Sequence, residues 1–176
     1  MLGLYYAINY PNTLDHLIVV GAAASNEYMR SIDSIYCSEN PKNHRLLEIL
    51  SILKSSDSSN ELKAQAAREW TEMSLHYPEK WDKYFSKLSS GGTVQKRLDY
   101  YNRYLSSFDI RNSLNLIKTR TLVMCGRYDA QCPISFSEEI HRLIEGSKLR
   151  LFEDSNHSPH IEEPENFKDV INRFFN

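Results

Sequence analysis

TRTLVMCGRYDAQCP, residues 119–133, carries the strongest indication of fold class in this chain of 176 residues. Residues 119–125 form an apolar run without alternation, which is typical of a strand buried on both faces of a parallel sheet. Asp129 follows this strand after a short turn. In open α/β sheets the functional side chains lie beyond the carboxyl ends of the strands, so Asp129 is a candidate site residue.

Two more strands are predicted on either side of the middle of the chain. His16–Val20 is a short apolar run closed by Gly21, and Lys148–Glu153 alternates apolar and polar residues. In the helix predicted between the second and third strands, Pro133 suits the first turn and Gly146 the carboxyl-terminal cap. Alternating strands and helices are typical of an α/β sheet. The helices predicted around these strands cover residues 1–10, 133–146 and 162–175.

Residues 26–107 contain no convincing strand and are predicted to be helical. Asn60 is the candidate N-cap of one of these helices. In another, the apolar stripe comprises Leu46, Leu47, Leu50 and Leu53. The four predicted helices are His44–Lys54, Asn60–His76, a segment around Trp81–Leu88, and Val94–Leu105. We therefore expect an α/β fold of about three parallel strands with flanking helices, with a partial core in residues 1–25 and 108–176 and an all-helical insertion in residues 26–107.

The composition narrows the class of protein. Hydrophobic residues make up 41% and charged residues 25%, as in ordinary soluble globular proteins. The formal charge is -2 and there is no basic run, so neither a nucleic acid nor a membrane is expected as a partner. Leu17–Ala24 is too short to span a bilayer, and the chain opens without the pattern of a signal peptide. The widely spaced Cys37, Cys125 and Cys132 indicate a reduced, cytoplasmic protein, and we expect no metal and no cofactor.

His157 lies just after the third predicted strand, as Asp129 lies after the second. Adjacent parallel strands are ~4.8 Å apart, so groups at their ends come within hydrogen-bonding reach. An aspartate that accepts from a histidine ring N–H leaves the other ring nitrogen free to act as a base. Considered alone, Asp129 would be interpreted as a helix cap and His157 as a histidine in a surface loop. Their joint placement favours an acid–base pair.

Two segments resemble the α/β-hydrolase fold family, in its proline iminopeptidase-like and small-esterase branch. GRYDAQCP (126–133) is similar to the family's G-x-x-D-x-x-x-P segment, and SNHSPHIEEPENF (155–167) to its closing segment. The resemblance implies that Asp129 is the acid and His157 the base of a Ser-His-Asp triad. Asn156 stands where many relatives have glycine, and asparagine tolerates left-handed backbone angles. LGLYYAINYPNTLDHLIVVGAAAS (2–25) resembles the helix and strand after the nucleophile elbow, and residues 26–107 would be the family's lid.

The resemblance also implies that the nucleophile is absent from this chain. The family's serine lies in G-x-S-x-G, just before the helix that here begins at Met1, and that half also supplies the oxyanion-hole amides. We therefore expect the carboxyl-terminal portion of a serine hydrolase for small esters or amides. Because losing a single oxyanion-hole donor costs ~10²–10³ in rate, this chain alone is expected to be inactive. Two substitutes for the serine are minor alternatives: a turn at Ser89–Gly92 that imitates an elbow, and the thiol of Cys132.

Aromatic residues of the insertion are candidates for lining a substrate pocket, foremost Trp70 and Trp81. Their spacing also suits the core stripes of amphipathic helices. Glu69 and Glu72 flank Trp70 and loosely resemble acidic lid residues that hold a substrate's amino terminus in proline iminopeptidases. Further candidates for the pocket are Tyr77, Tyr100 and Tyr101.

Other polar residues near the predicted site have structural interpretations. Ser25 would be a small lining residue and Cys125 part of the core. His160 would pack near the start of the last helix. Glu162 and Glu163 would favour the N-terminus of that helix through its dipole.

The alternative hypothesis is a non-catalytic protein that serves in binding or assembly. Three strands side by side would leave the outer edge of the first strand, Leu17–Val20, without a partner. An exposed apolar edge is prone to association. This hypothesis predicts a homodimer through that edge, whereas the enzyme hypothesis predicts a small ester or amide substrate as the partner.

Overall fold

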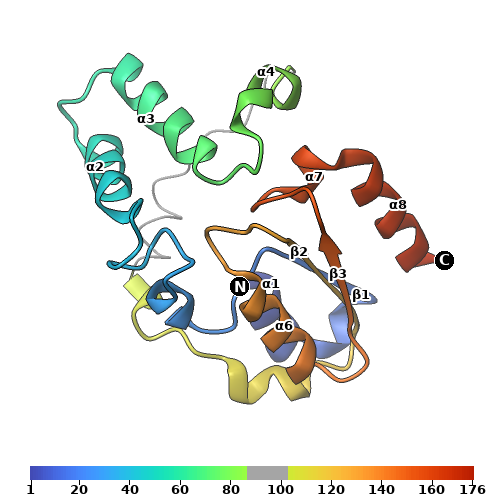
Figure 1. Ribbon diagram of the computed structural model, residues 1–176. Coiled ribbons are helices and arrows are strands. Elements are labelled where there is room, and N and C mark those ends of the chain that lie inside the picture. The colour runs from blue at the N-terminus through green and yellow to red at the C-terminus, as the bar shows by residue number, and fades with distance from the viewer. Residues whose placement is uncertain (87–102) are drawn as a thin grey trace.

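The computed structural model describes residues 1–86 and 103–176, and in this part of the chain a sheet of three parallel strands has the order β1-β2-β3 (Figure 1). β1 comprises His16–Val20, β2 Arg120–Gly126 and β3 Lys148–Phe152. Every residue of β2 after Arg120 is buried, as the uninterrupted apolar run predicts for a central strand. The predicted α/β class and its three parallel strands are confirmed.

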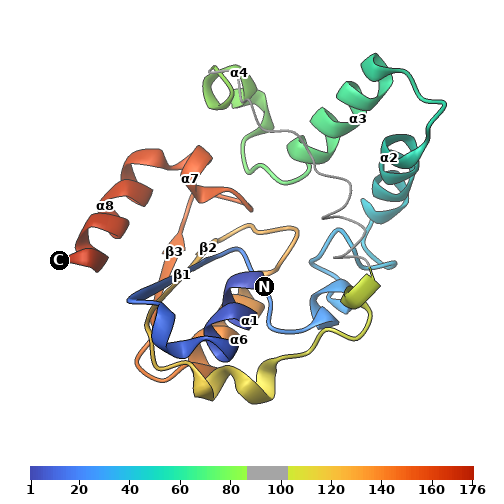
Figure 2. The ribbon, with the colours of Figure 1, turned by 180° about the vertical axis from the view of Figure 1, so that it is seen from behind.

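Helices cover both faces of the sheet because the side chains of the central strand alternate between them. Val123 packs in one buried cluster with residues of α1, Leu2–Asn9, and α6, Ile134–Leu143. Leu122 and Met124 pack on the opposite face with Phe174 of α8, which comprises Pro164–Phe175. Figure 2 shows α1 and α6 on one side of the strands and α8 on the other.

The last helix begins later than predicted. Pro159–Glu162 form a separate short helix, α7, and α8 begins at Pro164 instead of Glu162. Glu163, between the two helices, has φ −126° and ψ 58°, outside the helical region. A proline ring disfavours the helical region for the residue before it, and this divides the predicted helix.

The ends of α6 also differ slightly from the prediction. Pro133 is the N-cap residue directly before the helix and does not lie in its first turn. Gly146 lies beyond the C-cap residue, Ile144, in a turn where its φ is +73°. A positive φ suits glycine because a Cβ atom is strained there.

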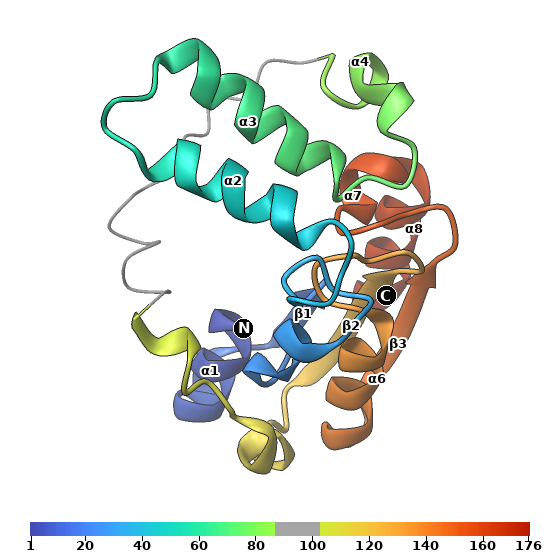
Figure 3. The same cartoon turned by 60° about the vertical axis from the view of Figure 1, so that its left-hand side comes forward.

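Residues 26–107, here called the cap, consist of helices, turns and loops in their described part. Figure 3 shows two of the cap helices, α2 (Asn43–Lys54) and α3 (Asn60–Glu72), lying side by side. Arg45 of α2 donates two hydrogen bonds, of 2.7 and 2.6 Å, to the carboxylate of Glu69 in α3. The next cap helix is the short α4, Trp81–Tyr84. Short 3-10 helices occur at Pro11–Thr13, Asn26–Arg30, Pro78–Lys80 and Arg111–Leu116.

Several details of the cap helices were predicted wrongly. The N-cap of α3 is Ser59, not Asn60, because the Ser59 hydroxyl accepts the N–H of Leu62 at 3.2 Å. This helix ends at Glu72 and does not reach His76. In α2 Leu47 is 58% exposed, and the buried face comprises Asn43, Leu46 and Ile49. Of the helix predicted at Val94–Leu105, residues 94–102 lie outside the described residues, and residues 103–105 are helical.

The cap leaves and rejoins the core at one crossing. Ser25 and Asp109 form an isolated antiparallel bridge. The N–H of Asn26 donates to the carbonyl of Phe108, and the N–H of Ile110 to that of Ala24, both at 2.8 Å. These bonds hold the two ends of the cap together at the sheet. In residues 1–86 and 103–176, no helix combines the length and the apolar composition needed to cross a membrane.

Candidate active site

Asp129 and His157 lie together at the carboxyl edge of the sheet. Asp129 belongs to the loop between β2 and α6, residues 127–133, called the aspartate loop. His157 belongs to the loop between β3 and α7, residues 153–158, called the histidine loop. Nδ1 of His157 lies 3.0 Å from each carboxylate oxygen of Asp129. The structure therefore brings together the two residues that the strand-end rule predicts to be neighbours.

The surroundings of Asp129 set the roles within this pair. Its Oδ1 accepts the backbone N–H of Gln131 at 2.9 Å and that of Cys132 at 2.8 Å, and the side chain is fully buried. Because the carboxylate acts as an acceptor, Nδ1 of the neutral His157 ring must donate to it. Nε2 is then the nitrogen with the free lone pair. The His157 side chain is 28% exposed, so this lone pair is accessible to a third group.

The histidine loop packs directly on the end of β2. A Cβ atom added to Gly126 would lie 1.9 Å from the backbone oxygen of Asn156, so only glycine fits beneath the loop. The Asn156 side chain accepts the N–H of Ala130 at 2.8 Å and thereby joins the two loops. In the described part of the chain no residue other than glycine has a positive φ, so Asn156 does not adopt the left-handed backbone considered for it.

Gly21, the first residue after β1, lies next to the side chains of Asp129 and His157. Its φ is +49°, and a Cβ atom there would lie 2.9 Å from Nδ1 of His157 and 3.0 Å from Oδ2 of Asp129. The sequence indicated Gly21 only as the end of a strand. Its signal as a site residue is its place directly after the first strand, at the same edge of the sheet as Asp129 and His157.

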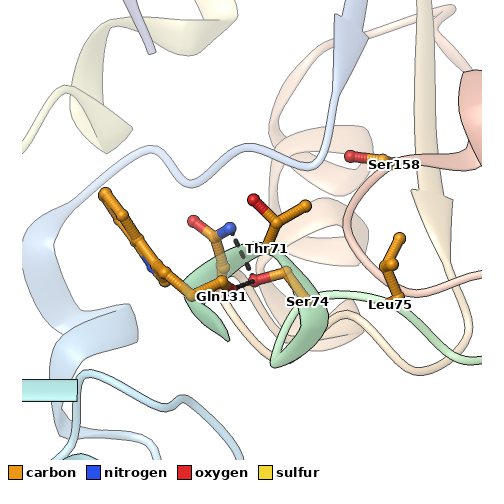
Figure 4. A pocket seen from close by; sticks show the side chains of 6 residues that line it. Thr71, Ser74, Leu75, Gln131 and Ser158 are labelled. Carbon is orange, nitrogen blue, oxygen red and sulfur yellow. Dashed lines mark hydrogen bonds between the residues drawn. The ribbon is translucent and has the colours of Figure 1, made fainter. Parts of the chain in front are cut away.

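The cap borders the other side of the histidine loop. The carbonyl of Ser74, just beyond α3, accepts the N–H of His157 at 3.3 Å, and its hydroxyl accepts from Gln131 Nε2 at 2.9 Å. A cavity of about 300 Å³ lies at this junction (Figure 4). Its lining residues are Trp70, Thr71, Ser74, Leu75, Gln131 and Ser158.

Of the two tryptophans predicted to bind substrate, Trp70 lines this cavity and Trp81 is placed elsewhere. The guanidinium of Arg68 lies 4.6 Å from the centroid of the Trp81 ring, and Phe85 packs on the ring at 4.2 Å. The substrate-binding role of both tryptophans stays a prediction. Of the tyrosines considered for the pocket, Tyr77 lies close to Asp154, its hydroxyl 3.4 Å from Oδ1, whereas Tyr100 and Tyr101 lie outside the described residues.

Glu69 and Glu72, compared above with carboxylates that hold a substrate's amino terminus, are engaged in ion pairs within the cap. Arg45 binds the Glu69 carboxylate through two nitrogens, and these hydrogen bonds lower the pKa of Glu69. Arg68 Nε donates to Glu72 at 2.8 Å. Neither carboxylate is among the residues that line the cavity.

The thiols and the hydroxyl near the site are buried. Cys132 is 5% exposed and packs with Ala23 and Tyr28. Burial and the nearby Asp129 carboxylate raise the pKa of Cys132, and they raise that of Cys125 to about 12. A thiol with a raised pKa is a weak nucleophile at neutral pH, which disfavours Cys132 as a substitute for serine. Ser25 is fully buried and caps a 3-10 helix, its hydroxyl accepting the N–H of Glu27. The Ser89–Gly92 turn lies outside the described residues.

Glu162 and Glu163 bind backbone and side-chain donors of the histidine loop, a role that the sequence did not indicate. Glu163 Oε1 accepts from the Ser155 hydroxyl at 2.7 Å and from the Asp154 N–H at 3.1 Å. Glu162 accepts from the Asn156 N–H at 2.8 Å. The helix-dipole interpretation is therefore incomplete. His160 lies near the last helix as expected, with its ring 5.8 Å from that of Phe167.

The start of α1 reaches the same edge of the sheet. Met1 packs against the buried cluster of Ala23, Tyr28 and Cys132, which follow β1 and β2 in the chain. Residues 1–86 and 103–176 contain no group of three or more histidine, cysteine, aspartate or glutamate side chains arranged to hold a metal ion.

Comparison with known proteins connects this geometry to hydrolases. No protein-family model matches the chain. A proline iminopeptidase of Heyndrickxia coagulans is 40% identical over 72 residues, which are 41% of this chain and 25% of that protein. Proline iminopeptidase PfmaB of Pestalotiopsis fici is 29% identical over 92% of this chain and 58% of its own length. The chain thus spans between about a quarter and three fifths of these curated relatives.

Solved structures match almost the whole chain. An alpha/beta fold family hydrolase from Bacillus anthracis str. Sterne has a TM-score of 0.94 and 38% identity, covering 98% of this chain and 63% of that one. An esterase from Exiguobacterium antarcticum has a TM-score of 0.65 and 25% identity, covering 98% of this chain and 62% of its own. A hydrolase from Pseudomonas aeruginosa PA01, at 18% identity and a TM-score of 0.64, shares the fold.

Proposed function

We propose that this chain, a member of the α/β-hydrolase fold family, carries the acid and the base of a serine-hydrolase site that cleaves esters or amides of small substrates. The observation that carries the proposal is the hydrogen-bonded pair of His157 and Asp129 at the carboxyl edge of the sheet. In the proposed site Asp129 is the acid and His157 the base. The serine and the oxyanion-hole amides come from residues outside this chain.

The proposed reaction uses the free lone pair on Nε2 of His157. This nitrogen takes the proton of the serine hydroxyl as the oxygen attacks the substrate carbonyl, and later returns it to the leaving group. Asp129 holds the ring in the required tautomer and stabilises the imidazolium that forms. The position of α1 supports the source of the missing groups, because Met1 packs at the same edge of the sheet as the pair. We propose that the serine reaches His157 from a segment that joins α1 at this edge.

The cavity beside the histidine loop supports a small substrate. At about 300 Å³ it is at the lower end of the range for ligand pockets, ~300–1,000 Å³. Trp70 and Leu75 supply apolar surface, and Ser158 adjoins His157. We propose that the cavity receives one end of the substrate. The pairing of Glu69 and Glu72 with arginines supports a neutral ester or amide over a substrate with a free amino terminus.

The experiment that tests the proposal restores the missing groups in one polypeptide. The part of the B. anthracis hydrolase that this chain does not match is fused in front of Met1, and hydrolysis of p-nitrophenyl acetate is measured. We expect turnover that falls by about 10³-fold or more in the His157→Ala fusion, because removing a triad member disables the whole unit. The chain without the fusion should stay close to the buffer rate. A folded fusion without turnover, or turnover independent of His157, would contradict the proposal.

A second candidate function, assembly without catalysis, is favoured by the outer edge of β1. In the described part of the chain β1 pairs with β2 alone, and its sequence HLIVV contains no Lys, Glu or Pro to discourage pairing. The neighbouring α1 exposes Leu2, Tyr5 and Tyr6. This candidate predicts a homodimer through Leu17–Val20, measured by light scattering at tens of micromolar. A strictly monomeric species at that concentration would exclude it.

A further inference from the structure

Glu162 is a buried charged residue that the proposed reaction does not use. It is 9% exposed, and its carboxylate accepts backbone N–H groups from the cap and from the histidine loop, that of Ser158 among them. Oε1 accepts from His76 of the cap at 2.6 Å. Oε2 accepts from Asn156 of the histidine loop at 2.8 Å. The carboxylate thus bridges two segments that are far apart in sequence.

The two bridged segments also bond to each other next to this carboxylate. The N–H of His157 donates to the carbonyl of Ser74, two residues before His76. Two consecutive amides of the histidine loop are therefore hydrogen-bonded. The N–H of Asn156 donates to Glu162, and the N–H of His157 donates to the cap. We call this closed set of three hydrogen bonds the Glu162 bridge. These hydrogen bonds fix the position of the backbone that carries the His157 side chain.

A carboxylate suits this position because it accepts several hydrogen bonds, although burying its charge is unfavourable. Burial raises the pKa of Glu162, while the backbone N–H groups around it act in the opposite direction. A glutamine would offer one acceptor oxygen for two N–H donors, and an apolar residue would offer none. Each buried donor left without an acceptor is unfavourable. The carboxylate is the side chain that satisfies both donors at once.

We propose that Glu162 is a positioning residue that fixes the orientation of His157 by tying the histidine loop to the cap. The proposal rests on the proposed function in so far as the base to be positioned is His157. Since the bridge joins the histidine loop to residues directly beyond α3, the cap supports the backbone of His157. Ser74, whose carbonyl takes part in the bridge, also lines the cavity proposed to receive the substrate.

The test uses the whole chain and needs no turnover. In the Glu162→Gln variant we expect the His157 Nδ1–H proton to exchange with solvent about tenfold faster than in the unaltered chain, as loss of a hydrogen bond allows more frequent opening. Glu72→Gln, a charge-matched change in an exposed pair of the cap, is the control and should leave the exchange unchanged. Equal exchange in a folded Glu162→Gln variant would overturn the proposal.

Amide hydrogen exchange in the unaltered chain keeps the test decisive if Glu162→Gln does not fold. The amides of His76 and Asn156 should be protected at least tenfold more than neighbouring loop amides that have no acceptor. Unprotected amides at both positions, in a chain whose β2 amides are protected, would also overturn the proposal. Neither readout depends on hydrolysis. Failure of the Glu162 bridge is therefore distinguishable from failure of the proposed hydrolase function.

Discussion

Gly21 lies directly beneath His157, so close that a Cβ atom on the glycine would lie 2.9 Å from Nδ1 of the histidine ring. The ring therefore rests on the backbone at the end of β1 while its Nδ1 faces Asp129. All three strands meet at this pair, because Gly21 follows β1, Asp129 lies in the loop after β2 and His157 in the loop after β3. The absence of a Cβ atom at Gly21 therefore leaves room for the observed arrangement of His157 and Asp129.

Replacing Gly21 with alanine should move the histidine ring. The change adds backbone strain at φ +49° and forces His157 away from Asp129. We expect a loss of stability of about 2–3 kcal/mol in urea unfolding, together with a weakened Nδ1–H signal of His157. Gly146→Ala is the matched control, since its φ is +73° but no atom lies within 4 Å of the added Cβ. It should lose about 1–2 kcal/mol from strain alone. Equal effects would show that Gly21 does not contact the ring in solution.

Gly126→Ala should be more damaging than either of these changes. The added Cβ would lie 1.9 Å from the Asn156 oxygen and 2.4 Å from that of Ser155, and both are backbone atoms that cannot rotate away. We expect a loss of about 3 kcal/mol or more, or a displaced histidine loop. Gly3→Ala, whose nearest contact is 3.6 Å, should be neutral or stabilising because alanine favours a helix. A Gly126→Ala variant as stable as the unaltered chain would contradict the close packing of the loop.

The three cysteines should be unreactive in the folded chain. All are buried, and burial raises the pKa of Cys125 to about 12 and that of Cys132 as well. Reaction with Ellman's reagent at pH 8 should be slow until denaturant is added, when three thiols per chain should react. Fast modification that is lost in Cys132→Ser would instead support Cys132 as a candidate nucleophile.

The buried Glu162 carboxylate should make the stability of the chain depend on pH. Burial raises its pKa above the ordinary value of 4.5, so the folded chain binds a proton there more tightly than the unfolded chain does. The stabilisation from this proton is complete below 4.5 and is lost as the pH rises through the raised pKa. The stability of the unaltered chain minus that of Glu162→Gln should therefore fall as the pH rises across this window. Urea unfolding at several pH values measures the difference. A constant or rising difference would contradict the burial of this carboxylate.

The sheet and the proximity of Asp129 and His157 were predictable because their signals are local. The apolar run of β2 indicates a strand buried on both faces, and Asp129 and His157 each follow their own strand directly. The support of His157 was not predictable in this way. Glu162 acts on His76, 86 positions away, through a backbone N–H that leaves no trace in the sequence. The fit of Gly126 under Asn156 likewise depends on how two loops approach each other. Helix ends were misplaced where a neighbouring residue decided them, as Pro164 does for α8.

The most direct measurement of the central claim is the tautomer of His157, read from long-range ¹H–¹⁵N correlations in the unaltered chain and in Asp129→Ala. In the neutral ring we predict a proton on Nδ1 and a free lone pair on Nε2, and a loss of this preference when the Asp129 carboxylate is removed. A proton on Nε2 in the unaltered chain, or a tautomer that does not respond to Asp129→Ala, would contradict the assignment of His157 as a base oriented by Asp129.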